Sequence, residues 1–357
     1  MKRARVLLAA GLILASCLAA PPAISWLRGA ESLPGALSDQ EFWALSSDMS
    51  EPGGWFRSDN LLSNELGFPF IVADLVKSGN TSRVYMGVGP EQNFNYIAAL
   101  KPKMAFVVDI RRGNLDVQLM YKALFELSAD RADFVSRLFS KRRPATLNAL
   151  STPDQIFQAF AVIGKSEELR NSNLLAMKAT LVATHHFALD SEDWKNISDA
   201  YSAFYTYGPD IRYSSTQGSG FGGYNQPSYA ELMTAVDAEG RPRSYLATEQ
   251  NYQVLRDLES RNLMVPVVGN FGGPKAIRAV GQYVKEHGST VSAFYLSNVE
   301  MYLNQQNLWE AFCRNVAALP LDPTSTFIRS ARGGGYGRGF GLNLTLSEIE
   351  PEVKDCR

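Results

Sequence analysis

The chain has 357 residues, and its 45% hydrophobic and 11% aromatic content is enough to bury a large core. Its 35 Lys and Arg residues nearly balance its 36 Asp and Glu residues. This balance gives no electrostatic case for a nucleic-acid partner, and the basic triplet at residues 141–143 is more typical of a solvated helix end. One enlarged α/β domain with a helical insertion fits this length better than two equal halves.

Residues 1–23 have the layout of an export signal. Three basic side chains within residues 2–5 precede an apolar run at residues 6–14, which is shorter than the roughly 20 residues of a membrane-spanning helix. The sequence Leu-Ala-Ser-Cys that ends at Cys17 matches the bacterial lipobox and predicts lipidation of that cysteine. Cleavage without lipidation is the alternative, after Ala19, Ala20 or Ala23. We therefore expect an exported bacterial protein that is periplasmic, or that is held at the membrane only by its signal or a lipid anchor.

Residues 24–57 are expected to form a linker and a short N-terminal helix. Ser38 and Glu41 have the spacing of a capping box, which predicts a helix that runs to about Ser47. Pro52 and the glycines after it then interrupt the helix.

Residues 58–129 are predicted to be the first half of a Rossmann-like α/β domain. Its expected elements are an amphipathic helix, an apolar strand, a second helix and a second apolar strand, near residues 70–77, 83–86, 92–100 and 104–109. Asn64 and Glu65 precede the first of these helices. They are candidates to reach over a ligand pocket, and helix capping is the alternative role.

The turn between the first strand and its helix contains two glycines. Gly87 and Gly89 let the backbone turn sharply and leave room for a ligand, because neither residue carries a Cβ. Asp109 ends the next strand and follows Gly89 by 20 residues. At this spacing a carboxylate accepts hydrogen bonds from the hydroxyls of a ribose.

The turn departs from the dinucleotide fingerprint where the third glycine is expected, because Pro90-Glu91-Gln92-Asn93 stands there. An acid at a helix start argues against a bound pyrophosphate, since two negative groups compete for the same donors. The stretch therefore resembles the first cofactor-binding motif of class I S-adenosylmethionine-dependent methyltransferases. The resemblance implies S-adenosylmethionine as the cofactor and Asp109 as its ribose ligand. From the same turn and strand end, Gly87, Gly89, Glu91, Asn93 and Arg111 join the expected binding set.

Arg111 and Arg112 lie two and three residues after Asp109. Either arginine is a candidate to hold an anionic substrate group or to restrain Asp109, and pairing with surface carboxylates is the alternative. No Gly-x-Ser-x-Gly elbow and no Walker lysine occur, which removes the commonest hydrolase and nucleotide-triphosphatase interpretations.

Residues 130–260 are predicted to form a helical insertion, or cap, because no convincing strand pattern occurs before about residue 207. A loop rich in Gly and Tyr follows at residues 213–224. Tyr213 and Gln217 are candidates to bind a substrate there, and a disordered surface loop is the alternative.

Residues 261–357 are predicted to be the second half of the Rossmann-like domain. Two parallel strands, a helix between them and an antiparallel pair of edge strands are expected, near residues 263–268, 290–296, 274–287, 326–329 and 341–346. Asn270 and Asn298 each follow the carboxyl end of a parallel strand, where open α/β sheets bind ligands. They resemble the polar turns that flank the transferred methyl group in the methyltransferases, which adds both to the binding set.

His185 and His186 are adjacent, so on a helix they point about 100° apart and do not share a metal. A capping or surface role is favoured, and a base under the cap is the alternative; no metal site is predicted. Cys313 is predicted to be a small buried hydrophobe. An oxidising compartment would permit it to pair with Cys356, and the sequence leaves this pairing open.

Two functions stay open. The first is an S-adenosylmethionine-dependent methyltransferase of unknown acceptor, with Asn270 or Glu300 near that acceptor. The second is a catalytically inactive envelope lipoprotein that binds a small ligand or a protein partner. Export favours the second, because S-adenosylmethionine is made and used in the cytoplasm.

Overall fold

The structure is a computed structural model that describes residues 32–77, 83–213, 215–216, 226–332 and 342–356. The predicted signal with Cys17, and Gln217 in the Gly/Tyr-rich loop, therefore lie outside the described residues. Within the described ranges, no helix is both long and apolar enough to cross a membrane.

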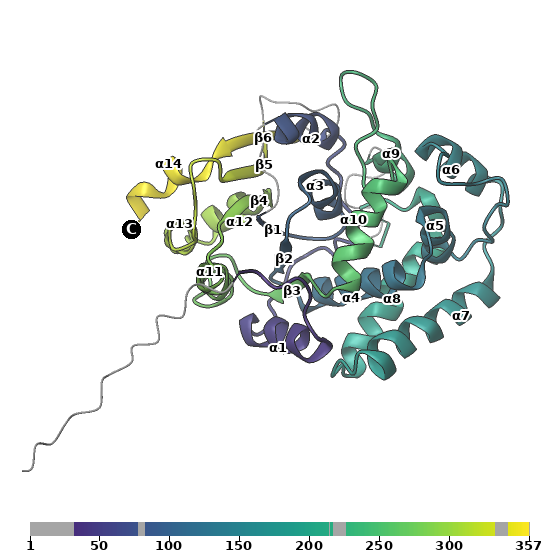
Figure 1. The fold of residues 1–357 in the computed structure, drawn as a ribbon, viewed down its shortest axis with the longest axis horizontal. Coiled ribbons are helices and arrows are strands. Elements are labelled where there is room, and N and C mark those ends of the chain that lie inside the picture. Colours follow the sequence, from purple (N-terminus) through teal and green to yellow (C-terminus); the bar gives the residue numbers. More distant parts are fainter. Residues whose placement is uncertain (1–31, 78–82, 214, 217–225, 333–341, 357) are drawn as a thin grey trace, which may run out of the picture.

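A six-stranded sheet forms the centre of the molecule, with helices around it (Figure 1). The strand order is β3-β2-β1-β4-β5-β6. All neighbours are parallel except β5 and β6, which pair antiparallel at one edge. The strands are β1 Val84–Gly87, β2 Met104–Asp109, β3 Met264–Val268, β4 Val291–Ser297, β5 Thr326–Arg332 and β6 Leu342–Glu348. This arrangement confirms the predicted fold class, including the antiparallel C-terminal edge.

The inner strands form because their sequences are continuous apolar runs. Every residue of β1, β2 and β3 is buried, as expected for parallel strands that are covered by helices on both faces. Val84 lies beside Met104 in the sheet, so the two strands on either side of the glycine turn are neighbours. The chain reverses its direction of travel between β1 and β4, and this switch point is where open α/β sheets bind ligands.

Helices cover both faces of the sheet because right-handed crossovers run in opposite directions from the switch point. On the side of the β1–β2 crossover, α3 packs against α2 and α10. On the side of the β3–β4 crossover, α11 packs against α1 and α13. These helices are α1 Asp39–Met49, α2 Phe68–Lys77, α3 Gln92–Leu100, α10 Glu249–Ser260, α11 Ala276–Glu286 and α13 Trp309–Ala317. The predicted capping box is present, since Ser38 and Glu41 bond to each other's backbone N–H at the start of α1.

The chain between β2 and β3 forms a helical insertion at the end of the molecule away from β5 and β6 (Figure 1). Its described residues add no strand to the sheet. The elements are α4 Arg112–Leu127, α5 Arg131–Phe139, α6 Pro153–Ala161, α7 Glu167–Lys178, η1 Ala179–Thr184, α8 Ser191–Tyr207, η2 Gly208–Asp210 and α9 Tyr229–Thr234, before α10. Arg112 joins α4 to α8 through two hydrogen bonds of 2.8 Å to Asp193, and it does not border the pocket described below.

His185 is the C-terminal cap residue of η1, which agrees with the expected capping role. Its mostly buried side chain bridges two other helices rather than lying on the surface. Its Nδ1 lies 2.7 Å from Asp39 Oδ1 on α1, and its Nε2 lies 2.6 Å from Glu126 Oε2 on α4. Burial opposes protonation of this imidazole, but the two carboxylates outweigh burial and raise its pKa. The alternative role as a base in the cleft finds no support, because His185 does not border the pocket described below.

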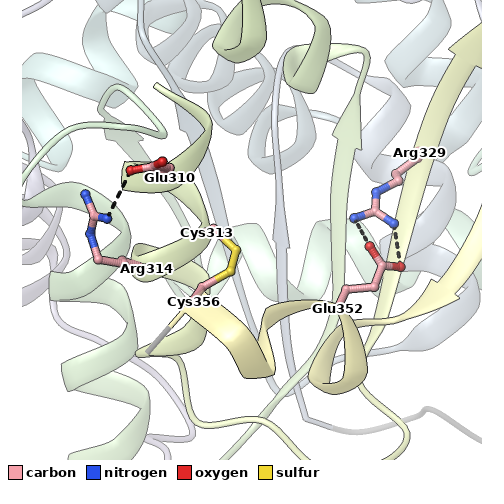
Figure 2. The surroundings of a disulfide bond; sticks show 6 residues. All are labelled: Glu310, Cys313, Arg314, Arg329, Glu352 and Cys356. Carbon is pink, nitrogen blue, oxygen red and sulfur yellow. Dashed lines mark hydrogen bonds and ion pairs between the residues drawn. A yellow bond between two sulfur atoms is a disulfide. The ribbon is translucent and has the colours of Figure 1, made fainter. Parts of the chain in front are cut away.

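Cys313 and Cys356 form a disulfide, which settles the pairing that the sequence left open (Figure 2). Helix α14 (Ile349–Val353) and the turn η4 (Lys354–Cys356) return the C-terminus to α13, and the two Cα atoms lie 5.5 Å apart. Cys313 is also buried, as its apolar neighbours indicated. Arg329 holds the same segment by an ion pair of 2.7 Å to Glu352.

Candidate functional site

A pocket of about 280 Å³ lies at the carboxyl edge of the sheet, over the switch point. Four strand ends contribute to it: Val88 and Gly89 after β1, Asp109 and Ile110 at β2, Gly269 to Phe271 after β3, and Ser297 with Asn298 at β4. Parallel strands bring their carboxyl ends to one edge, and this explains why residues far apart in sequence meet here.

The opposite wall comes from the segment between α1 and α2 and from helix α12 (Val299–Gln305). The segment crosses the sheet edge because Gly54 N–H donates to the Ile110 carbonyl at 2.7 Å and Glu51 N–H donates to the Val268 carbonyl at 2.8 Å. The pocket residues of this wall are mostly aromatic or polar, and they include Trp55, Phe56, Arg57, Asn60, Asn64, Tyr302 and Gln306. The sequence prediction found only Asn64 among them.

The glycine turn is built around Asn93, which does not border the pocket. The Asn93 side-chain amide donates to the carbonyls of Val88, Gly89 and Pro90 at 3.0, 3.1 and 2.7 Å. Gly89 has a positive φ of 77° and so needs to be glycine. Gly87 needs to be glycine for another reason, because a Cβ there would collide with the Asn93 side chain. Asn93 and Gly87 therefore shape the turn rather than contact a ligand.

Glu91 is also directed into the protein. Its carboxylate accepts the Ser63 backbone N–H at 3.0 and 3.1 Å and makes no cap bond to α3. Burial raises the pKa of Glu91 to about 8. Glu91 therefore links the segment between α1 and α2 to the glycine turn, and it does not border the pocket.

Asp109 borders the pocket and is 4% exposed. Its Oδ1 accepts the Arg111 backbone N–H at 2.9 Å, and Arg111 Nε lies 3.5 Å away. Burial raises the pKa of the Asp109 carboxyl, and Arg111 and the Gly89 backbone only partly offset this. Arg111 also donates to the Asp59 carbonyl and does not border the pocket, so it restrains Asp109 and the wall segment.

Asn270 and Asn298 both border the pocket, whereas Glu300 does not. Asn270 Oδ1 accepts the Gly272 N–H at 3.0 Å, which orients its side chain in the turn after β3. Glu300 forms an ion pair of 2.9 Å with Arg329 instead. The structure thus brings six of the predicted residues to one pocket: Asn64, Gly89, Asp109, Tyr213, Asn270 and Asn298.

Two charged side chains of opposite sign border the pocket in the described part of the chain. Arg57 and Asp109 are the charged side chains among its described lining residues. The nearby start of α11 already holds a carboxylate, because Glu51 accepts the backbone N–H groups of Lys275 and Ala276 at 2.8 and 2.9 Å. Across the described ranges, no cluster of three or more His, Cys, Asp or Glu side chains is arranged to hold a metal ion.

Residues 61–161 and 220–342 match the family described as Domain of unknown function (DUF7790). The match covers more than half of the chain, and the chain therefore belongs to this family. The two matched ranges contain the four strand ends of the pocket. None of the curated proteins compared with the chain matches it.

Proposed function

We propose that the pocket binds a nucleoside-type small molecule, and that S-adenosylmethionine is the ligand to test first. One observation carries the proposal: Asp109 and Gly89 stand at the ends of neighbouring strands and border the same pocket. A carboxylate at this place suits the two hydroxyls of a ribose, and a glycine beside it leaves space for the attached group.

The remaining walls support a ligand of this kind. Ile110 and Phe271 offer apolar surface on the far side of Asp109, next to strand β3, where a planar base would be covered. In the other direction, β4 lies two strand spacings from β2, or roughly 10 Å. A group carried on the ribose 5′ carbon extends along this direction, toward Ser297 and Asn298.

Methyl transfer is the enzymatic form of this proposal, with Asn270 or Asn298 beside the acceptor. Glu300 is no longer a candidate to lie beside the acceptor, because it is paired with Arg329. Binding without transfer is the other form, and it agrees with export of the chain.

We propose export from residues 1–23, with Cys17 as the lipidated residue. Fractionation of tagged wild type and Cys17→Ala tests this, and an intact N-terminus in the cytosol contradicts it.

Titration calorimetry with S-adenosylmethionine and S-adenosylhomocysteine tests the ligand. Asp109→Ala removes two charge-assisted hydrogen bonds, so we expect binding weaker by roughly 2–4 kcal/mol, at about 1.5–3 for each bond with some replacement by water. Asp257→Ala is the matched control, because Asp257 is exposed on α10 and pairs with Arg261 there. Wild type that releases no heat at millimolar ligand contradicts the proposal. Binding that Asp109→Ala leaves unchanged places the ligand elsewhere.

A further inference from the structure

Glu65 is a buried carboxylic acid behind the β4 end of the pocket. It is 4% exposed, and its carboxylate accepts hydrogen bonds from two side-chain hydroxyls: Tyr295 at 2.8 Å and Ser297 at 2.7 Å. No Lys, Arg or His in the described ranges forms an ion pair with Glu65. A buried acid without a cation is costly for the fold, so this one calls for an explanation beyond packing.

Ser297 connects this acid to the pocket. It is the last residue of β4, it borders the pocket, and it has a positive φ of 48°. The register of β4 against β5 also shifts between Tyr295 and Ser297. A serine rarely adopts a left-handed backbone, and such strain gathers at functional sites. Ser297 thus belongs both to the lining of the pocket and to the hydrogen-bonded group around Glu65, at the turn from β4 to α12.

We propose that Ser297 is a nucleophile, that Glu65 is its base, and that the substrate is a carboxylic ester bound in the pocket. A nucleophile and a base within hydrogen-bond reach, with the base held by a third group, are the general signature of such a site. Tyr295 is that third group, because its hydroxyl donates to the other Glu65 oxygen. Asn298 borders the pocket next to Ser297, and in the proposed reaction its side-chain amide donates to the ester carbonyl.

The proposed reaction has two steps. Glu65 takes the proton of the Ser297 hydroxyl while Oγ bonds to the carbonyl carbon, and the carbonyl electron pair moves to oxygen. When the carbonyl re-forms, the bond to the alcohol breaks, and the alcohol takes the proton from Glu65. Water then attacks the acyl-serine in the same way and releases the carboxylic acid and Ser297. Burial raises the pKa of Glu65, which makes the carboxylate a better base.

This site lacks the Gly-x-Ser-x-Gly pattern, because Tyr295 and Val299 flank Ser297 at the two glycine positions. The proposal also does not depend on the nucleoside ligand. If adenosine compounds failed to bind, the proposed esterase site would be unaffected. If Ser297 failed to react, the proposed nucleoside binding would be unaffected.

Labelling of the full chain with a fluorophosphonate probe tests the proposal. Wild type should gain one adduct, mapped by peptide mass spectrometry to Ser297. Ser297→Gly should lose it, and glycine tolerates the left-handed backbone. Glu65→Gln should slow labelling by roughly 100-fold or more, the contribution of a general base. Glu300→Gln is the matched control for a lost carboxylate, since Glu300 pairs with Arg329, and it should label like wild type.

Any of the following results would overturn the proposal: no adduct on wild type, an adduct on another residue, or a Glu65→Gln rate equal to the wild-type rate. Circular dichroism shows whether each variant is folded. If Glu65→Gln does not fold, the rate at Ser297 is compared between folded wild type and wild type in urea. Equal rates in those two states also overturn the proposal.

Discussion

The disulfide between Cys313 and Cys356 should contribute strongly to the stability of the fold. Cys356→Ser removes the bond with little change in packing, because Cys356 is only partly buried whereas Cys313 is buried. The bond closes a loop with a sequence separation of 43. By the chain-entropy relation, a loop of this length restricts the unfolded chain by about 4 kcal/mol at 25 °C.

The native state should change little when the bond is lost. Ile349 and Val353 on α14 stay buried against the core, and Arg329 still holds Glu352 (Figure 2). We therefore expect the free energy of unfolding to fall by about 2–4 kcal/mol, mostly through the unfolded state. The same argument predicts a larger denaturant slope, because an unlinked chain exposes more surface when it unfolds.

Urea denaturation of wild type, Cys356→Ser and reduced wild type gives both quantities. Reduced wild type should match Cys356→Ser, since both lack the same bond. An unchanged midpoint in Cys356→Ser would refute the reasoning. A reduced wild type that keeps the stability of the oxidised protein would refute it equally.

Three other substitutions test contacts that hold the fold around the pocket. Gly87→Ala places a Cβ against the Asn93 side chain, so we expect the free energy of unfolding, measured by urea denaturation, to fall by about 1–3 kcal/mol. An unchanged free energy would show that the turn can shift to accommodate the Cβ. Glu51→Ala removes the acceptor of two backbone N–H groups at the start of α11 and should lower the free energy of unfolding by about 1–2 kcal/mol. An unchanged free energy would mean that water replaces the carboxylate. His185→Gln removes an imidazole whose folded pKa is raised, so the stability difference from wild type should be full below about pH 6.5 and shrink as the pH rises through the folded pKa. A difference that grows with pH would contradict the assignment of His185.

The sheet was predictable because buried parallel strands leave a local signal. The six residues of β2 are all buried and all but the last are apolar, so their sequence alone indicated the strand and its end at Asp109. The end of strand β5 was harder to predict from the sequence. It extends to Arg332, three residues past the expected end, because pairing with β6 continues over polar residues.

The strand-end residues of the pocket were predictable for a similar reason. Gly89, Asp109, Asn270 and Asn298 follow the ends of parallel strands, and all parallel strands share that edge. The sequence did not show which side chains of the glycine turn point toward the pocket and which point into the protein. Asn93 lies in the right turn but bonds inward to its carbonyls.

Long-range contacts explain what the sequence did not reveal. The wall segment with Trp55 reaches the pocket through the bond between Gly54 and Ile110, which no local pattern indicates. The disulfide depends on where the last helix docks. The contact between Ser297 and Glu65 was overlooked because the two residues are more than 200 positions apart in the sequence.

The central claim is that Asp109 accepts the hydroxyls of a ribose, and one calorimetric comparison tests it most directly. Adenosine and 2′,3′-dideoxyadenosine are titrated into wild type and Asp109→Ala. We predict that wild type binds adenosine roughly 30-fold or more tightly than the dideoxy compound, and that Asp109→Ala binds the two alike. Equal affinity of wild type for both compounds, or a preference that survives Asp109→Ala, would contradict the claim.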